Sequence, residues 1–504
     1  MSALQSQRVA EATGSKIRSG VAWKALSQIT LQVSRTVVAL VLARMLAPHD
    51  WGLAAMVLVF SGFAVVFTDS ALGTALIQRR DLNEADKSTV FWVNVAIGAV
   101  LAVAGLAFAG TLARFYGEPE IRGLFAALSI GFFVTGLGST HLALLVRDME
   151  FRKLELRQIA ATLVGAGTGV TVAVKGFGPW AIIGQQLGEA VTSTLLLWLM
   201  TPWRPSATVS RASLSKLGGF AGNVFGENLL YQAGRNLGNL LIGRFLGPAA
   251  VGAYALATNV ILVPFSRLAG PLQQVFFPAF SRMRDDPEQM ATVWIRATRL
   301  VGLVSIPSLV GLGLVAPDFV AVVLGNRWDK TATVIQILAC VGIVQSLQSL
   351  NGEVLLALNR AGTLFRFTIV WFAASVAAFA IGIHWGVLGV AACFAAATLL
   401  VEPLRTYLTT RALGISPWAV VRSLGGVVQA TTVLAVAVIA ARQTLIAIGM
   451  PTAPRLVCLV LVGASAFAGG CLWRAPDLIG EIRAVLRRPR PAVPARIEAA
   501  EARP

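Results

Sequence analysis

Apolar stretches long enough to form a membrane-crossing helix recur along almost the whole of this 504-residue chain. A helix of about 20 apolar residues spans the hydrocarbon core of a bilayer. Charged residues make up only 13% of the sequence, whereas soluble globular domains carry roughly 25%. The longest polar interruption, near Phe280–Met290, is a short loop, so a large soluble domain does not fit. The sequence therefore predicts an all-α, polytopic membrane protein.

We predict about fourteen transmembrane helices separated by short turns. Clusters of proline, glycine and acidic residues, such as Ala47–Asp50 and Lys175–Pro179, are typical of tight turns and separate neighbouring spans. The predicted spans are 21–46, 51–77, 88–113, 121–146, 154–175, 178–201, 219–244, 250–277, 293–316, 332–357, 364–384, 386–410, 419–441 and 454–473.

The lysines and arginines test this topology. With the N-terminus in the cytoplasm, and with most residues near a span end counted with the adjoining segment, 29 are assigned to cytoplasmic segments, 9 to outer segments and 4 to spans, which together make the 42 in the chain. Cytoplasmic segments of membrane proteins carry such an excess of basic residues. Both termini are therefore predicted to be cytoplasmic. Residues 1–20 lack the apolar core of a cleavable signal peptide, and the tail from Pro476 is expected to be mostly disordered.

The net charge of +18 would indicate a nucleic-acid partner in a soluble protein. Here the arginines lie between apolar segments, so topology explains them and no nucleic acid is expected. The four cysteines lie in apolar runs without CxxC spacing, which predicts small buried hydrophobic side chains rather than a metal site or a disulfide. The three histidines are scattered. We therefore expect no metal, no cofactor and no catalytic residues.

An internal repeat is the sharpest signal in the chain. Six residues recur at a spacing of 200, and further along Arg152 and Gly178 match Arg360 and Gly386 at a spacing of 208. One small insertion in the second half accounts for the change in spacing. The six matches are Gln32, Arg35, Arg44, Leu46, Pro48 and Gly52 with Gln232, Arg235, Arg244, Leu246, Pro248 and Gly252.

The repeat predicts the architecture. Each copy holds an even number of helices, so both copies have the same orientation, related by a pseudo-twofold axis along the membrane normal. A cavity is expected between the lobes, around the first helix of each. The predicted parts are a cytoplasmic tail (1–20), a six-helix N-lobe (21–201), a six-helix C-lobe (212–412), two further helices (413–475) and a second cytoplasmic tail (476–504).

Polar side chains follow one face of the first helix in each lobe. Arg35 and Arg235 lie near the middle of their spans, where a charge costs at least about 2.5–3.5 kcal/mol unless it faces water or a partner. One interpretation is a structural arginine that pairs with Glu189 or Glu227. The other is an anion-binding arginine, because a guanidinium forms bidentate hydrogen bonds with phosphate. The predicted cavity residues are Lys24, Gln28, Gln32, Arg35, Asn228, Gln232, Arg235 and Asn239.

Further intramembrane charges are candidates for a gate or for ion coupling. Asp69 and Arg267 come late in the second helix of each lobe and differ from repeat equivalence by two residues. They form a cytoplasmic gate if they pair across the lobes; alternatively, each pairs within its own lobe. Glu189, Glu227 and Glu402 are carboxylates that could carry a coupling proton or sodium ion, and the sequence does not choose among them.

Four segments of the chain resemble a known family. The run LARMLAPHDWGLAAMVLVFSGFAVVFTDSALGTALIQRRDLNEADKSTVFWVN is similar to Wzx-type polysaccharide exporters, in particular the colanic-acid-exporter-like branch. These exporters belong to the multidrug/oligosaccharidyl-lipid/polysaccharide flippase superfamily. The resemblance covers about residues 18–412 and identifies the family better than the substrate. The other segments are ARFYGEPEIRGLFAALSI, RDMEFRKLELRQI and VVLGNRWDKTATVIQIL.

The resemblance implies a flippase in the bacterial inner membrane that works by alternating access. Its substrate would be an undecaprenyl-pyrophosphate-linked oligosaccharide, moved to the periplasmic leaflet for exopolysaccharide, capsule or O-antigen synthesis. A proton or sodium gradient and the polymerase and co-polymerase of the pathway are further expected partners, besides membrane lipids. The chain contains no Walker A motif, so direct ATP hydrolysis is not expected.

Three alternatives stay open. A lipid II flippase would share the fold and a cationic cavity, and a drug/cation antiporter would favour an acidic one. A membrane polymerase or ligase of polysaccharide synthesis would act on the same lipid carrier, but the predicted outer loops are too short for its active residues.

Overall fold

The computed structural model describes residues 30–32, 34–68, 76, 82–210, 232 and 236–474, with side chains except those of 63–68, 262–275 and 474. Within these residues the regular structure is entirely helical, so the predicted all-α class is confirmed. The described chain forms two compact units. One contains residues up to Ala257 with 323–334 and 375–394, and the other contains 258–322, 335–374 and 395–474.

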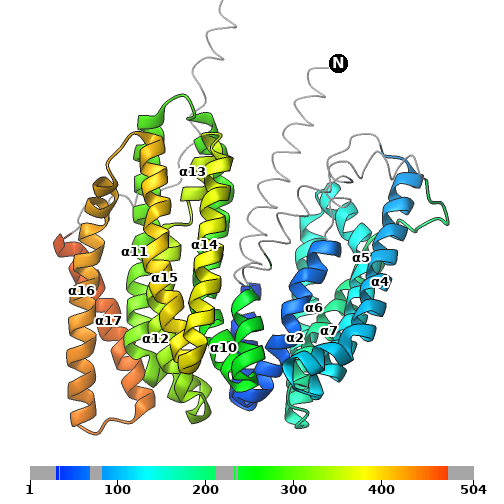
Figure 1. Cartoon of the computed structure of the whole chain (residues 1–504), viewed down its shortest axis with the longest axis horizontal. Helices are drawn as coiled ribbons and strands as arrows, with labels where there is room; N and C mark the ends of the chain where they lie inside the picture. Colours follow the sequence, from blue (N-terminus) through cyan, green and yellow to red (C-terminus); the bar gives the residue numbers. More distant parts are fainter. Residues whose placement is uncertain are drawn as a thin grey trace, which may run out of the picture. The chain divides into compact units, whose positions relative to one another are not determined.

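The first unit is built mainly from long helices that run close to antiparallel, drawn in blue to cyan in Figure 1. Residues 34–45 and 236–246 are helical as well, and the unit also contains the first turns of α10 (Pro248–Arg282). Its complete labelled helices are α2 (Pro48–Thr68), α4 (Glu84–Tyr116), α5 (Glu120–Arg147), α6 (Phe151–Val174), α7 (Trp180–Met200) and the short η2 (Asn326–Trp328) and η3 (Ile383–Trp385).

In the second unit, α11 packs against α16 and α17. α16 and α17 form an antiparallel pair joined by a short turn. The helices of this unit, several of them shared with the first, are α10, α11 (Pro287–Phe319), η1 (Val320–Leu324), α12 (Asp329–Leu347), α13 (Asn351–Ala357), α14 (Ala361–Gly382), α15 (Gly386–Leu413), α16 (Pro417–Ala447) and α17 (Thr452–Arg474).

Local sequence determines where these helices begin and end. At the start of α4, the Asn83 side chain accepts the backbone N–H of Asp86 at 2.7 Å, and the Asp86 carboxylate accepts the N–H of Asn83 at 3.2 Å. This reciprocal capping satisfies N–H groups that the helix itself leaves unpaired. At its other end, Gly117 adopts a left-handed conformation with φ 75°, which is common where helices terminate. The apolar run is thus bounded by polar turns.

The first turns of α2 and α10 make the same contact with each other. A Cβ added to Gly52 would lie 1.7 Å from the carbonyl oxygen of Pro248, and one added to Gly252 would lie 1.9 Å from that of Pro48. Residues 200 positions apart therefore meet reciprocally, as a local twofold axis requires. The predicted pseudo-twofold relation between the repeats is confirmed at this contact.

The later spacing of 208 residues also appears in the backbone. Gly178 lies in the turn between α6 and α7, and Gly386 is the first residue of α15 directly after η3; their φ angles are 53° and 71°. Gly117 and Gly325, also 208 residues apart, have φ 75° and 93°. The two halves therefore turn at equivalent points, in agreement with the repeat. The predicted lobe boundaries remain predictions.

One predicted span is interrupted. Instead of a continuous helix over 332–357, α12 ends at Leu347 and α13 begins at Asn351. Polar side chains at this break bind neighbouring helices: Gln348 Nε2 donates to Thr406 Oγ1 at 2.7 Å, and Trp294 Nε1 donates to Asn351 Oδ1 at 3.1 Å. These hydrogen bonds stabilise a turn that apolar periodicity alone does not indicate.

Seven of the described helical segments are long and apolar enough to cross a membrane. Helical residues occur within each of the fourteen predicted spans, but the count of fourteen crossings stays a prediction. The seven are Glu84–Tyr116, Glu120–Arg147, Pro287–Leu324, Asn326–Ala357, Ala361–Leu413, Pro417–Ala447 and Thr452–Trp473.

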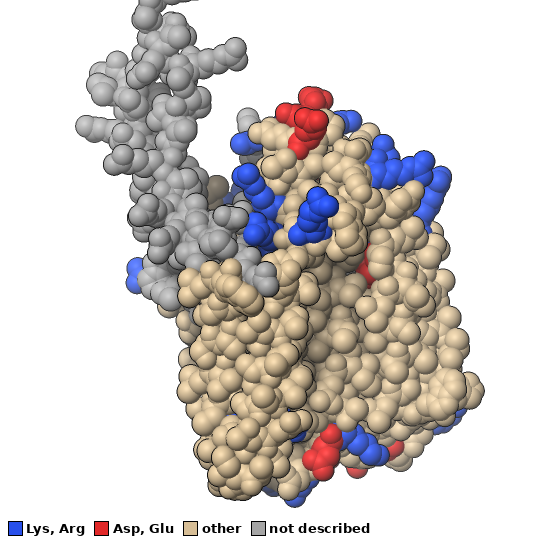
Figure 2. All heavy atoms as spheres, turned by 90° about the vertical axis from the view of Figure 1, so that its left-hand side faces the viewer, with Lys and Arg blue, Asp and Glu red and all other residues tan. Residues whose placement is uncertain are grey.

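The surface agrees with a bilayer environment. On the face over α16 and α17, charged residues gather at the two ends and leave a band almost without charge between them (Figure 2). On α4, Val100 and Phe108 are 66% and 63% exposed, which in a membrane means contact with lipid. One sequence prediction is wrong here: Cys340 is exposed, and the other cysteines are only partly covered. In a membrane, an apolar helix is as stable against lipid as against protein. An apolar sequence around a cysteine therefore does not predict that the cysteine is buried inside the protein.

Candidate functional site

Close packing of α6 on α7 places an acidic side chain of α7 against polar side chains of α6. A Cβ added to Gly165 would lie 2.8 Å from the carbonyl oxygen of Gln185 and 3.0 Å from the Cβ of Glu189. Small residues at such positions let two membrane helices approach each other closely. The glycine therefore brings the Glu189 carboxylate within reach of polar side chains on α6.

Arg35 forms an ion pair with Glu189. Arg35 Nη2 donates to Glu189 Oε1 at 2.9 Å, so the helix of residues 34–45 is tied to α7. The same oxygen accepts from Gln158 Nε2 at 2.7 Å and from Thr162 Oγ1 at 3.3 Å, both on α6. Three donors from two helices thus converge on one carboxylate oxygen, which stabilises its negative charge.

A second arginine extends this cluster. Arg157 is only 8% exposed and donates to Gln158 Oε1 at 2.9 Å and to Ser193 Oγ at 3.0 Å. It also interacts electrostatically with Glu189. Glu155, one turn before Gln158 on α6, also interacts electrostatically with Arg157, so the two arginines face two carboxylates and the cluster is balanced in charge. A phosphate that displaced Glu189 from Arg35 would meet a guanidinium whose attraction is stronger in the low dielectric of a membrane protein than in water.

The two side chains of the ion pair differ in how far they are exposed. The Arg35 side chain is 41% exposed and that of Glu189 is 20% exposed. Arg35 is therefore held by Glu189 on one side while much of its side chain stays open. The pairing is the one expected of a structural arginine, and the open side is what an anion-binding arginine needs. Both interpretations thus remain, and a role in substrate binding stays a prediction.

The sequence did not single out Arg157, Gln158, Thr162 or Ser193. Arg157 lies near a predicted span end, where the charge count treated it as a topology signal. A helical spacing could have found the others: Gln158 and Thr162 are four residues apart, as are Glu189 and Ser193, so each pair lies on one face of its helix. Polar pairs of this kind inside apolar spans indicate a buried hydrogen-bond network.

The predicted cavity amides are placed in part. Gln32 Nε2 donates to Thr36 Oγ1 at 3.3 Å, whereas its Oε1 is buried without a hydrogen-bond partner. Gln232 approaches α2, because a Cβ added to Gly62 would lie 2.1 Å from its Nε2. Asn239 is partly exposed. Their predicted role in a cavity is not tested by these contacts.

Several predicted site residues lie outside the described residues, and their roles stay predictions. For Arg267 the structure describes the backbone within α10 but not the side chain. The predicted gate between Asp69 and Arg267 is therefore untested, as is the equivalence of Arg235 to Arg35. The residues outside the description are Lys24, Gln28, Asp69, Glu227, Asn228 and Arg235.

A separate charged cluster occupies the second unit. Glu402 is 4% exposed, and its Oε2 is buried without a hydrogen-bond partner. Arg405, one turn further along α15, interacts electrostatically with both Glu402 and Glu353. The sequence included Glu402 among the coupling candidates but did not predict its neighbours.

Comparison with known proteins places the chain in a family. Residues 41–333 match the family described as "Polysaccharide biosynthesis protein". The chain is 30% identical over 399 residues to the lipopolysaccharide biosynthesis protein WzxC of Escherichia coli, covering 78% of this chain and 80% of that one. It is 27% identical to the teichuronic acid biosynthesis protein TuaB of Bacillus subtilis, over 69% of this chain and 73% of TuaB.

Solved structures show the same fold. An inward closed structure of the lipid II flippase MurJ superposes with a TM-score of 0.69 at 13% identity, covering 90% of this chain and 99% of MurJ. An inward-facing MATE multidrug resistance transporter gives 0.62 at 14% identity, over 77% and 98% of the two chains. The fold is thus that of membrane flippases and transporters, as the sequence resemblance implied. On the match over residues 41–333 and the identity to WzxC, the chain belongs to the polysaccharide biosynthesis protein family.

Proposed function

We propose that this chain is a flippase that moves a lipid-linked oligosaccharide from the cytoplasmic to the periplasmic leaflet of a bacterial inner membrane. The family and the transporter fold support transport during polysaccharide synthesis. The observation that carries the substrate class is the cluster around Arg35, a half-open arginine inside an apolar helix bundle. We take the substrate to be an oligosaccharide on an undecaprenyl pyrophosphate.

The chemistry of such a substrate explains the cluster. Its pyrophosphate is anionic and its sugars are rich in hydroxyl groups, so neither crosses hydrocarbon unaided. Arg35 offers charge-assisted hydrogen bonds to a phosphate, and Glu189 prevents the arginine from standing alone when no substrate is bound. Gln32 adds an amide on the same helix for sugar hydroxyls. The prenyl tail needs no such groups and remains in lipid.

Glu189 also offers a route to ion coupling. A phosphate that binds Arg35 competes with the Glu189 carboxylate for the same guanidinium. Release of Arg35 would leave Glu189 free to take up a proton or a sodium ion. This exchange would couple transport to an ion gradient. As a separate part of the proposal, which rests on the distribution of basic residues, both termini lie in the cytoplasm.

The second candidate is the lipid II flippase activity named for MurJ, because the fold is shared at a TM-score of 0.69. The identity to WzxC over 399 residues favours polysaccharide precursors over lipid II. Loss of a lipid II flippase would stop cell-wall synthesis, whereas loss of a polysaccharide flippase would stop only the surface polymer.

Deletion of the gene tests the proposal. Polysaccharide export should stop, and lipid-linked repeat units should accumulate in the cytoplasmic leaflet, out of reach of a membrane-impermeant glycan label. If the chain were a polymerase or a ligase, single repeat units would instead accumulate in the periplasmic leaflet and react with the label. That result would contradict a flippase.

A further inference from the structure

We propose that a pocket beside Arg442, between α11, α12 and α16, binds the phosphate group of an anionic membrane phospholipid. The pocket lies within the second unit and shares no residue with the cluster around Arg35. An experiment that disproves lipid binding in this pocket would therefore not contradict the proposed flippase function.

The pocket borders a buried ion cluster. Asp318, at the end of α11, is 1% exposed. Its Oδ2 accepts from Arg442 Nε at 2.9 Å, and its Oδ1 accepts from Arg455 Nε at 2.8 Å and from Arg455 Nη2. Both carboxylate oxygens are thus engaged, and two arginines share one negative charge. The three side chains retain a net charge of +1, which attracts a further anion.

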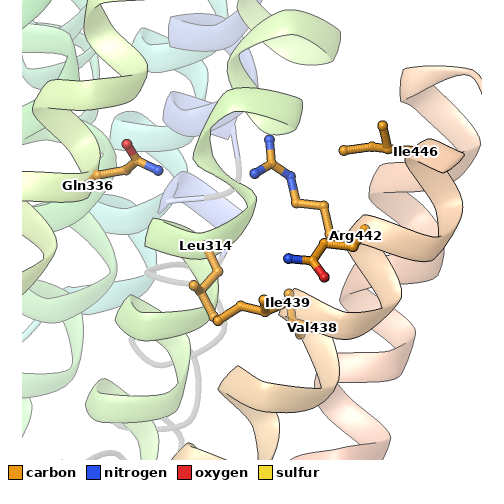
Figure 3. A pocket seen from close by; sticks show the side chains of 7 residues that line it. Leu314, Gln336, Val438, Ile439, Arg442 and Ile446 are labelled. Carbon is orange, nitrogen blue, oxygen red and sulfur yellow. The ribbon is translucent and has the colours of Figure 1, made fainter.

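Arg442 presents this charge to the pocket. It engages Asp318 through Nε, and its side chain is 33% exposed. Figure 3 shows the guanidinium extending from α16 into the pocket, on the side bounded by Gln336 of α12. Gln443 adds a second amide. Gln336 Nε2 donates one N–H to the Gly313 carbonyl at 3.2 Å, which leaves its second N–H, the Gln443 amide and the Arg442 guanidinium as donors that a phosphate oxygen can accept from.

The rest of the lining is apolar. The cavity has a volume of about 180 Å³, and besides Arg442 and the two glutamines its walls are Leu314, Val438, Ile439 and Ile446. Ile439 and Ile446 are 45% and 49% exposed, so the pocket opens toward the apolar surface of α16. Pockets for drug-sized ligands are larger, about 300–1,000 Å³. The size and lining suit a phosphate with its glycerol attached to chains that remain in lipid.

The depth of the pocket matches this ligand. α16 has 31 residues, which at 1.5 Å per residue gives about 46 Å, close to the roughly 40–45 Å of a bilayer with its headgroups. Arg442 lies five residues before the end of this helix at Ala447, or about 7.5 Å along the axis. That position falls at the inner edge of the headgroup layer, from which a long arginine side chain can reach the lipid phosphates.

Thermal unfolding of the purified, delipidated full-length protein in detergent tests this site. Added phosphatidylglycerol should raise the unfolding midpoint of the wild-type protein. The variant Arg442→Gln should need at least about tenfold more phosphatidylglycerol for the same rise, because it loses charge-assisted hydrogen bonds to the phosphate. Arg422→Gln, an exposed arginine at the opposite end of α16, is the matched control and should respond as the wild type does.

A second variant and two control ligands complete the test. If Arg442→Gln does not fold, the double variant Gln336→Leu with Gln443→Leu decides, because neither glutamine touches the ion cluster by a described hydrogen bond. Equal responses of all variants would overturn the site. Equal stabilisation by phosphatidylcholine would overturn its selectivity for an anionic lipid, and equal stabilisation by inorganic phosphate would overturn the assignment to a lipid.

Discussion

At the scale of single residues, intramembrane charge was the informative signal. Its position in the middle of an apolar span predicted that Arg35 needs a partner or a ligand, and Glu189 was one of two carboxylates expected to serve as partner. The structure confirms the contact between Arg35 and Glu189. Arg157 was not predicted, because an arginine near a span end looks the same in sequence whether it faces the cytoplasm or a buried network.

Loss of the Arg35 charge should stop transport without unfolding the protein. Arg35→Ala leaves Glu189 with two donors from α6, so the carboxylate keeps much of its stabilisation. A bound phosphate would lose a charge-assisted partner that contributes roughly 1.5–3 kcal/mol. Polysaccharide export, measured with the membrane level of the protein, should fall strongly for Arg35→Ala and partly for Arg35→Lys. By the repeat, Arg235→Ala should behave like Arg35→Ala.

A purely structural arginine predicts the reverse pattern. Arg35→Ala would then be poorly expressed, and combining it with Glu189→Ala would restore the protein level and export together. Normal export from the Arg35→Ala, Arg235→Ala double variant would contradict any role of these arginines in binding the substrate.

At the scale of helices, apolar length and turn residues predicted where helices lie better than how they pack. The helix ends of α4 and α16 follow capping residues that are visible in the sequence. The break between α12 and α13 was missed, because it depends on hydrogen bonds to Thr406 and Trp294, which come from elsewhere in the chain. The repeat relates Gly52 to Gly252, but only the structure shows that these two residues meet.

A methyl group at the contact of α2 with α10 should prevent correct packing. Gly52→Ala places a Cβ 1.7 Å from the backbone oxygen of Pro248, and a backbone atom cannot rotate away as a side chain does. We expect little folded protein in membranes, measured by size-exclusion chromatography of a fluorescent fusion. The control Gly110→Ala lies in α4 with nothing within 4 Å of the added Cβ. It should be neutral or slightly stabilising, by about 0.5–1 kcal/mol. A monodisperse Gly52→Ala protein would contradict this packing.

The Asp318 ion cluster should stabilise the contact of α11 with α16 and α17. Removing one partner of a buried ion pair costs roughly 3–5 kcal/mol, and since Arg442 and Arg455 are 33% and 17% exposed, the lower end is expected. Asp318→Ala should therefore lower the thermal unfolding midpoint in detergent. Glu288→Ala, at an exposed position on the same helix, should leave it nearly unchanged. Equal midpoints for the two variants would show that the cluster does not stabilise the fold.

At the scale of the whole molecule, the repeat gave the prediction that the structure confirms, whereas the topology predicted from the charge distribution stays a prediction. The 200-residue spacing predicted a pseudo-twofold relation, which the reciprocal contact of Pro48 with Gly252 and Pro248 with Gly52 confirms. The number of crossings and the cytoplasmic gate are not tested, since several of the residues concerned lie outside the described part of the chain. The sequence pattern alone does not show which charged side chains of one lobe contact those of the other.

The predicted topology has a direct test. Since fourteen crossings return the chain to the side where it began, a reporter fused after Pro504 should lie in the cytoplasm. Alkaline phosphatase, which is active only in the periplasm, should therefore stay inactive there, while green fluorescent protein at the same site should fluoresce. An active phosphatase fusion would require an odd number of crossings.

Transport by the purified protein tests the central claim most directly. The protein is reconstituted into liposomes that carry an undecaprenyl-pyrophosphate-linked oligosaccharide, and the fraction of its sugar within reach of an externally added, impermeant glycosidase is followed over time. In liposomes with wild-type protein, glycan from the inner leaflet should become accessible much faster than in protein-free liposomes, and Arg35→Ala should abolish most of the gain. Accessibility that stays at the protein-free rate, with the protein correctly folded and inserted, would contradict the account.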